Sequence, residues 1–308
     1  KDQAINILRN IHFIINPKAG SGKNILEKEF LGSYFKEKEY CISVKYSKFK
    51  KQAILLTQDS IREGAQTIVA CGGDGTINEV ASCLVGTNIL LGIIPIGSGN
   101  GLASHLMIPS IIEKAIEIIK NNDIVTIDVG KVNESFFFSN TGMGFDANVI
   151  KNYEALKKRT LIGYLKASLR SFNEFKRGRD VRISIDEDHT INNPFLVFVS
   201  NSNELGFNIS LTPKASLMDG QLDVLIVPEL SKLKMLLFGA LMLVRKYHWL
   251  KEIKTYQTKT LQIYRNEGLF LDSQIDGEFY KVEEKHINIS IMEKSLGILA
   301  PQNIEPQL

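Results

Sequence analysis

Residues 67–78, TIVACGGDGTIN, decide the fold prediction. The stretch begins as an apolar, β-branched run typical of a buried strand and ends in three glycines around Asp74, followed by Thr76. Glycines allow the backbone to approach a ligand closely, and the N-terminus of a following helix adds partial positive charge. The stretch therefore predicts a strand, a phosphate-binding turn and a helix, although an ordinary turn with Thr76 as the helix cap stays open.

Two further glycine-rich turns follow other predicted strands. Residues 95–101 read PIGSGNG and residues 16–23 read NPKAGSGK. The second is not a Walker A motif, because Pro17 replaces its first glycine and Asn24 its closing serine or threonine. Ligands favour the carboxyl ends of parallel strands, so three such turns in one sheet favour a binding site there.

The first part of the chain alternates strand-like and helical stretches, which is typical of a layered α/β domain with parallel strands. The predicted strands are residues 11–15, 42–46, 67–70 and 90–94, and the predicted helices are residues 25–38, 52–63, 77–84 and 110–120. With 308 residues, the chain favours two domains. We expect an α/β domain at residues 1–123 and a strand-rich domain at 124–308, with a return of the last residues to the first domain left open.

Beyond residue 123 strands follow strands, which predicts antiparallel pairing. The strand-like runs are residues 124–132, 136–140, 181–185, 195–200, 222–227, 258–264, 268–275 and 286–291. Helical character returns at residues 147–175, with a break near 159–163, and at 232–248. We therefore expect a β-rich second domain interrupted by helices.

Composition excludes several classes of protein. With 44% hydrophobic and 23% charged residues, the chain is globular, and a net charge of +3 is too small to indicate nucleic-acid binding. Three cysteines cannot all pair, so a reducing cytoplasm is expected. The longest apolar run, residues 235–244, is about half a membrane span, so no transmembrane segment is expected. A homodimer stays open.

Six motifs together resemble the diacylglycerol kinase catalytic family, which includes bacterial lipid kinases and the sphingosine and ceramide kinases. Three are the glycine-rich stretches NPKAGSGK, GGDGTINEV and PIGSGNGLA. The others are NTGMGFDA at residues 140–147, TPKASLMDGQLDV at 212–224 and QIDGE at 274–278. They occur in family order over nearly the whole chain.

The resemblance implies an ATP-dependent lipid kinase with an α/β nucleotide-binding domain, a β-sandwich-like lipid-binding domain and an active site between them. ATP would be bound by residues that match the family's nucleotide-binding set. These are Asn16, Ser47, Gly72, Gly73, Asp74, Gly75, Thr76, Ile77, Asn78 and Ser98. Ser47 has no signal of its own beyond this match.

The resemblance also implies a Mg²⁺ site and two catalytic carboxylates. Asp219, with the backbone carbonyls of Ser216 and Gln221, matches the metal site, and hard oxygen ligands suit Mg²⁺. Glu278 matches the proton acceptor, and Asp74 would organise metal and phosphate. From the residues alone, Asp219 sits in a simple turn and the Asp276-Gly277 pair is a hairpin turn, with Asp276 an alternative base.

Two departures leave the lipid open. Gly101 stands where several bacterial diacylglycerol kinases carry an aspartate, and Asn148 stands where the sphingosine kinase branch tends to place an acidic substrate contact. Diacylglycerol is the expected substrate, with a sphingoid base or another lipid alcohol as the alternative. An NAD kinase-like enzyme, which shares GGDG, and an inactive lipid- or nucleotide-binding protein are further alternatives.

Residues 232–249, KLKMLLFGALMLVRKYHW, have basic and aromatic side chains at both ends of an apolar centre. This pattern is typical of a helix that lies at a membrane interface, although a core helix is the alternative. We expect Leu237 and Leu241 to contact the membrane, with the lipid substrate presented at its inner surface.

Overall fold

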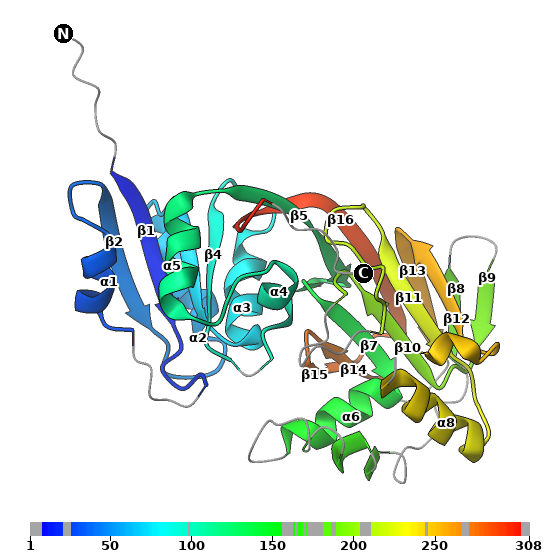
Figure 1. The fold of residues 1–308 in the computed structure, drawn as a ribbon. Coiled ribbons are helices and arrows are strands. Elements are labelled where there is room, and N and C mark those ends of the chain that lie inside the picture. The colour runs from blue at the N-terminus through cyan, green and yellow to red at the C-terminus, as the bar shows by residue number, and fades with distance from the viewer. Residues whose placement is uncertain are drawn as a thin grey trace. The chain divides into compact units, whose positions relative to one another are not determined.

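The chain forms two compact units in a computed structural model. The first comprises the chain up to Ile127 and a returning segment that begins at Ser295, and the second comprises Asp128–Lys294. Figure 1 shows the helices and strands of both units. The structure describes residues 8–20, 26–97, 99–155, 163, 166–168, 170–171, 181–185, 189–203, 211–243, 246–265 and 271–302.

The first unit is built on parallel strands in the order β2-β1-β3-β4. These strands are β1 (Arg9–Ile15), β2 (Tyr40–Tyr46), β3 (Thr67–Gly72) and β4 (Leu90–Pro95). Its helices are α1 (Lys28–Tyr34), α2 (Gln52–Arg62), α3 (Asp74–Leu84), α4 (Gly101–His105) and α5 (Ile112–Asn121). The layered α/β prediction is confirmed. Every residue of β3 is buried, as expected for a central parallel strand.

Helix α3 begins at Asp74, three residues before the predicted start. Gly73 is its N-cap in an extended conformation, so the glycine turn leads directly into the helix. Thr76 therefore lies inside the first turn and is not the helix cap. The stretch predicted to bind phosphate thus consists of a strand end and a helix N-terminus with only Gly73 between them.

The second unit is a β-sandwich, as the family resemblance implied. One layer is the six-stranded sheet β12-β11-β10-β7-β14-β15, and the other is formed by β5, β6, β8, β9, β13 and β16. The strands are β5 (Ile124–Val132), β6 (Ser135–Phe137), β7 (Asn140–Gly144), β8 (Val181–Ile185), β9 (His189–Asn192), β10 (Leu196–Ser200), β11 (Leu222–Val227), β12 (Lys254–Thr258), β13 (Thr260–Arg265), β14 (Leu271–Ile275), β15 (Glu278–Val282) and β16 (His286–Leu299).

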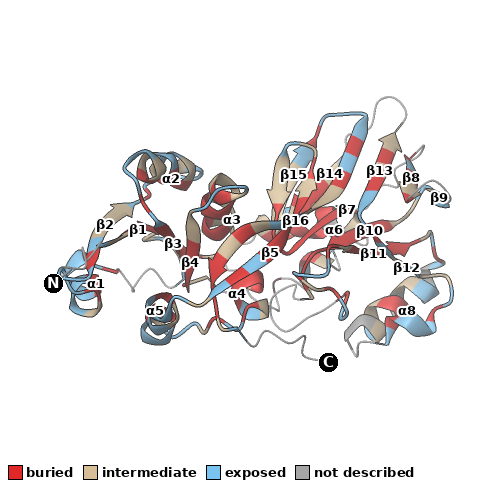
Figure 2. Cartoon of the chain, turned by 90° about the horizontal axis from the view of Figure 1, so that it is seen from above, coloured by how far each residue is buried: buried red, intermediate tan, exposed pale blue. Residues whose placement is uncertain are grey.

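Apolar side chains from both layers fill the sandwich core. Alternate residues of β10 and β11, such as Val199 and Val224, pack with Ile183, Ile263 and Ile289 of the opposite layer. Figure 2 shows the buried residues in red along these strands. The core follows the period-two pattern of strands with one face toward the opposite sheet.

The described helices of the second unit overlap both predicted helical stretches, and α8 ends before the predicted residue 248. Helix α6 spans Phe145–Glu154, and most of the rest of the predicted stretch 147–175 lies outside the described residues. Helix α8 spans Lys232–Leu243, and the 3₁₀ helix η1 follows at Tyr247–Trp249. No helix in the described part of the chain is long and apolar enough to span a membrane.

The strands of the second unit differ from the prediction in several places. The run predicted at 136–140 is divided between β6 and β7, and the short strands β9, β12 and β15 were not predicted. Strand β16 continues to Leu299, eight residues past the predicted end at residue 291. The end of β16 pairs in parallel with β4, where Ile298 lies opposite Leu91. The two residues are far apart in sequence, so local sequence patterns could not predict this pairing.

Gly130 in β5 allows the packing of the second unit to be tested by mutation. It pairs with Phe137, and a Cβ at Gly130 would lie 2.1–2.4 Å from ring atoms of that buried phenylalanine. We expect Gly130→Ala to destabilise the protein by about 1–3 kcal/mol in urea unfolding, because the ring cannot move within a packed core. Gly239→Ala in α8, where nothing lies within 4 Å, is the control and should be neutral or stabilising. Equal effects at the two sites would contradict this packing.

Candidate functional site

Three glycine-rich loops meet at the carboxyl ends of β1, β3 and β4. A Cβ at Gly20 would lie 2.4 Å from the Ile96 carbonyl oxygen, and a Cβ at Gly97 would lie 2.5 Å from the Gly73 Cα. Gly20 also has φ +64°, a conformation that side chains disfavour. Backbone therefore contacts backbone directly where the loops converge.

The Asp74 carboxylate joins two of these loops. Its Oδ2 accepts the backbone N–H of Asn100 at 2.8 Å, and its Oδ1 accepts that of Gly101 at 2.8 Å. A Cβ at Gly99 would lie 2.9 Å from the same Oδ2, so a side chain there would crowd this arrangement. Asp74 thus anchors the turn after β4 from the first turn of α3.

The other nucleotide-binding candidates of this unit lie on the same loops or beside them. Asn16 Nδ2 donates to Thr76 Oγ1 at 3.3 Å, and Asn16 Oδ1 accepts the Lys18 N–H at 3.0 Å. Ser47 is buried directly after β2, where its N–H donates to the Ile15 carbonyl at 2.9 Å. Asn78 Oδ1 accepts from Ser82 Oγ. Ser98 lies outside the described residues.

This arrangement suits a phosphate group. The first backbone N–H groups of α3 have no partners within the helix, and the helix dipole adds partial positive charge at its start. The Gly73 N-cap forms no side-chain cap hydrogen bond. Backbone donors at a glycine turn followed by a helix N-terminus form an anion-binding concavity.

In the second unit, Asp276 and Gly277 form the predicted hairpin turn between β14 and β15. Both have positive φ, 48° and 79°, as a type I′ turn requires. The Asp276 carboxylate accepts the backbone N–H groups of Phe138, Ser139 and Asn140, the shortest at 2.8 Å. Asp276 therefore fixes the backbone at the start of β7. Because its carboxylate oxygens already accept these hydrogen bonds, Asp276 is a poor candidate for the catalytic base.

Glu278 is the first residue of β15 and lies directly after this turn. It is partly exposed and pairs across the hairpin with Ile275. The adjacent Phe279 N–H donates to Glu154 Oε1 of α6 at 2.9 Å. The backbone around Glu278 is thus fixed by the turn on one side and by α6 on the other.

The loop that contains the metal-site candidates is held by Asp128, a buried carboxylate. Asp128 Oδ2 accepts the Gly220 N–H and its Oδ1 accepts the Lys294 N–H, both at 2.7 Å. Within the loop, Asp219 Oδ1 accepts the Gln221 N–H at 3.0 Å, and Ser216 Oγ accepts the Met218 N–H. Sequence reasoning did not single out Asp128, although a lone aspartate within the apolar run of residues 124–132 was a signal.

Burial raises the pKa of two neighbouring carboxyl groups at this loop. The pKa of Asp219 is raised by burial and by the charge of Asp128. The pKa of Asp223 is raised to about 6 by burial, with a further contribution from Asp219. Asp219 itself is exposed, and the buried Asp128 and Asp223 add negative charge beside it, so the oxygen donors of Asp219, Ser216 and Gln221 suit Mg²⁺. Within the described residues, no cluster of three or more His, Cys, Asp and Glu side chains could hold a metal ion.

A row of buried polar side chains crosses the six-stranded sheet. Asn140, Ser200 and Asp223 are cross-strand partners on β7, β10 and β11, so they share the face that lies away from the sandwich core. Ser200 Oγ and Asp223 Oδ2 are buried without a hydrogen-bond partner among the described residues. Farther along the same face, Phe198 and Leu225 belong to an apolar cluster with α8 and η1.

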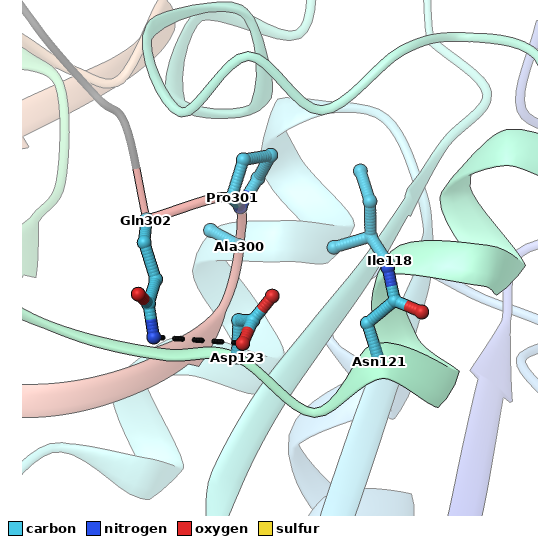
Figure 3. A pocket seen from close by; sticks show the side chains of 6 residues that line it. All are labelled: Ile118, Asn121, Asp123, Ala300, Pro301 and Gln302. Carbon is cyan, nitrogen blue, oxygen red and sulfur yellow. Dashed lines mark hydrogen bonds between the residues drawn. The ribbon is translucent and has the colours of Figure 1, made fainter.

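The pocket in Figure 3 lies elsewhere in the first unit. It has a volume of about 290 Å³ and is lined by residues at the end of α5 and after β16. Asp123 Oδ1 accepts from Gln302 Nε2 at one side of it. None of the lining residues belongs to the glycine loops, so this pocket is separate from the predicted phosphate site. They are Ile118, Asn121, Asp123, Ala300, Pro301 and Gln302.

The cysteines offer no reactive group at the glycine loops. Cys71 in β3 is fully buried, and burial raises the pKa of its thiol far above the usual range. Burial likewise raises the pKa of Cys83 to about 11. Thiols with such pKa values stay protonated and are inert, so cysteine chemistry has no part in the site.

Asp223 makes stability depend on pH. Its carboxyl titrates near 6 in the folded state and near 4 when unfolded, so the folded state holds the extra proton between these values. Stability from this group is therefore lost as pH rises from about 4 to 6. We expect Asp223→Asn to match the parent near pH 4 and to exceed it in stability at pH 7 in urea unfolding with EDTA. Exposed Glu283→Gln is the control. A stability difference that does not grow between these pH values would contradict the assignment.

Comparison with known proteins matches both units to family models. Residues 10–132 match the diacylglycerol kinase catalytic domain, and residues 139–297 match the YegS C-terminal NAD kinase beta sandwich-like domain. The matched stretches contain all six motifs of the sequence prediction, which is thereby confirmed.

Relatives carry the same family names. A YegS-like lipid kinase of Cronobacter sakazakii is 30% identical over 60% of this chain and 64% of its own length. A diacylglycerol kinase of Staphylococcus aureus is 27% identical over 96% of this chain and 94% of its own. A crystal structure from Bacillus anthracis described as a diacylglycerol kinase has the same fold, with a TM-score of 0.77, 24% identity and 99% coverage of both chains. The chain therefore belongs to the diacylglycerol kinase catalytic family of lipid kinases, with a C-terminal domain of the YegS type.

Proposed function

We propose that this lipid kinase transfers the γ-phosphate of ATP to the hydroxyl group of diacylglycerol. The observation that carries the proposal is the convergence of three glycine loops around the Asp74 carboxylate at the carboxyl edge of one parallel sheet. The named Staphylococcus aureus relative, which matches over 96% of this chain, supports diacylglycerol as the acceptor. The roles of individual residues are proposed for each unit separately.

In the first unit, the backbone of residues 72–78 receives the ATP phosphates. Gly72 and Gly73 have no side chains, so the phosphates can approach the backbone closely. The N-terminus of α3 provides partial positive charge. Asn16, Ser47 and Ser98 complete the proposed nucleotide set. Phosphoryl transfer depends mainly on positioning and charge stabilisation, so a rigid backbone cradle is suited to it.

In the second unit, Glu278 acts as the base. The lipid hydroxyl oxygen forms a bond to the γ-phosphorus while the bond from that phosphorus to the β–γ bridging oxygen breaks. Glu278 takes the hydroxyl proton, and ADP leaves with the bridging oxygen. Asp276 is not the base in this proposal, because its carboxylate already accepts three backbone N–H groups.

Mg²⁺ fits the oxygen donors of both units. Asp219 and the carbonyls of Ser216 and Gln221 would hold one ion beside the buried carboxylates of the second unit. Asp74 would organise the ion that accompanies the ATP phosphates, although its oxygens also serve the Asn100 and Gly101 N–H groups. When bound, Mg²⁺ neutralises charge on the phosphates.

The acceptor lipid follows less directly from the site. Gly101 contributes no side-chain carboxylate to the second loop, and Asn148 lies on α6 without a charge. A sphingoid base carries an amine that would favour an acidic partner, whereas diacylglycerol carries no charge. Gly101 departs from the aspartate of several bacterial diacylglycerol kinases and does not favour either lipid. The neutral Asn148 favours diacylglycerol, because the sphingosine kinase branch tends to place an acidic substrate contact at this position.

Incubation with a total lipid extract and labelled ATP tests the activity and the acceptor together. We expect one lipid, identified by mass spectrometry as phosphatidic acid, to carry the label. A phosphorylated sphingoid base, ceramide or undecaprenol would replace diacylglycerol as the substrate. Labelled NADP formed from added NAD would favour the NAD kinase-like alternative. No labelled product at all would favour the inactive binding protein.

Glu278→Gln tests the base. The amide keeps the size of the side chain and cannot accept the proton, so we expect kcat to fall by roughly 100-fold or more. ATP affinity, measured by calorimetry, should stay at the parent value because the proposed ATP residues belong to the first unit. Glu284→Gln, an exposed carboxylate shortly after β15, is the matched control. Near-normal phosphorylation by Glu278→Gln would refute the base role.

A further inference from the structure

Helix α8 has two faces with different surroundings. Phe238 is buried with Tyr247 and Leu250 in the cluster that covers Phe198 and Leu225 of the sheet. This half of the helix is a core helix, as the alternative interpretation expected. Leu241 also packs partly against this cluster, which corrects its predicted place at a membrane contact.

The opposite side of the helix exposes large apolar side chains. Leu233 is 78% exposed and Leu237 is 47% exposed, and their spacing of four residues places them on the same side of the helix. Trp249 of η1 is 61% exposed. The exposed face of α8 is pale blue in Figure 2. We call Leu233, Leu237 and Trp249 the apolar face.

One contact joins the start of α8 to the segment around η1, and a second lies within that segment. Lys234, between the two leucines, forms an ion pair with Glu252, three residues after Trp249. Lys246 places its Nζ 4.6 Å from the centroid of the Trp249 ring. The start of α8 and the segment around η1 therefore lie side by side.

Basic residues surround the apolar face. Residues 228–254 contain six basic and two acidic side chains, a net charge of +4. The whole chain has a net charge of +3, so all other residues together carry −1. Within the described part, Lys234, Lys246, Lys251 and Lys254 are exposed. Lys234 follows Leu233 in the helix, and Lys246 contacts the Trp249 ring.

We propose that the apolar face and its surrounding lysines dock the enzyme onto an anionic lipid bilayer. Exposed leucines can insert among acyl chains, tryptophan favours the headgroup region, and lysines are attracted to anionic headgroups. The combination fits an anionic bilayer better than a second protein, because lysines lie beside exposed leucine and tryptophan side chains in a segment with a net charge of +4. The inference rests on the proposed function, since a kinase of a membrane lipid must reach its substrate at a bilayer.

Trp249 is the only tryptophan of the chain, so its fluorescence reports on this surface alone. We expect a blue shift of its emission when vesicles of phosphatidylglycerol and phosphatidylcholine are added, and quenching by brominated acyl chains. The shift should be weaker with vesicles of phosphatidylcholine alone, which lack anionic headgroups. It should also be weaker at high salt, which screens the attraction between the lysines and anionic headgroups. Unchanged emission with anionic vesicles would overturn the proposal.

Leu233→Asp tests the apolar face without disturbing the core, because this side chain is mostly exposed. We expect its vesicle partition coefficient, measured by co-sedimentation, to fall roughly tenfold, since a leucine leaves the acyl layer and a negative charge enters. Leu55→Asp on α2, where the leucine is 54% exposed, is the matched control and should bind vesicles as the parent does. Equal loss in both variants would refute the assigned surface.

Kinase assays separate this inference from the proposed function. With water-soluble short-chain diacylglycerol, Leu233→Asp should retain parent turnover, whereas with long-chain diacylglycerol in vesicles its turnover should fall with binding. A parent protein that binds vesicles and phosphorylates neither substrate refutes the proposed function alone. If Leu233→Asp instead converts a dimer into a monomer in analytical ultracentrifugation, with vesicle binding intact, the surface is an interface between copies and the docking proposal fails.

Discussion

The first unit depends on the direct approach of backbone to backbone at the carboxyl edge of its sheet. Gly20 lies against the Ile96 carbonyl and Gly73 against Gly97, at separations that leave no room for a Cβ. The Asp74 carboxylate then joins the loops after β3 and β4 through two N–H groups. Such contacts leave backbone donors, rather than flexible side chains, to form the proposed phosphate site.

The second unit uses buried carboxylates in a similar way. Asp276 accepts three consecutive N–H groups at the entrance of β7, and Asp128 joins the loop before β11 to the backbone at Lys294. A carboxylate that accepts several N–H groups fixes segments that are far apart in sequence. In each case an acidic side chain fixes the backbone of a sharp turn through hydrogen bonds. The neighbouring base candidate Glu278 and metal-ligand candidate Asp219 therefore follow a fixed backbone.

Sequence patterns correctly predicted the features that depend on residues close together in the chain. The strands of the first unit and the glycine turns follow from periodicity and glycine spacing, and the family motifs identified the kinase. The extension of β16 to Leu299 was not predictable, because it depends on pairing with β4 at Leu91, far away in sequence. Asp128 was missed for the same reason, since its partners Gly220 and Lys294 are distant. Leu237 and Leu241 look alike in sequence, and only packing against Phe198 and its neighbours separates them.

The hydrogen bond between Asp74 and residue 101 uses a backbone N–H, which almost every amino acid possesses. The anchor therefore needs no particular side chain at this position, only a residue that keeps its N–H. Gly101 is also buried at the start of α4, so a larger residue here would keep the donor and would have to find room inside the fold. The hydrogen bond thus leaves the identity of residue 101 free, and the packing around it limits that identity.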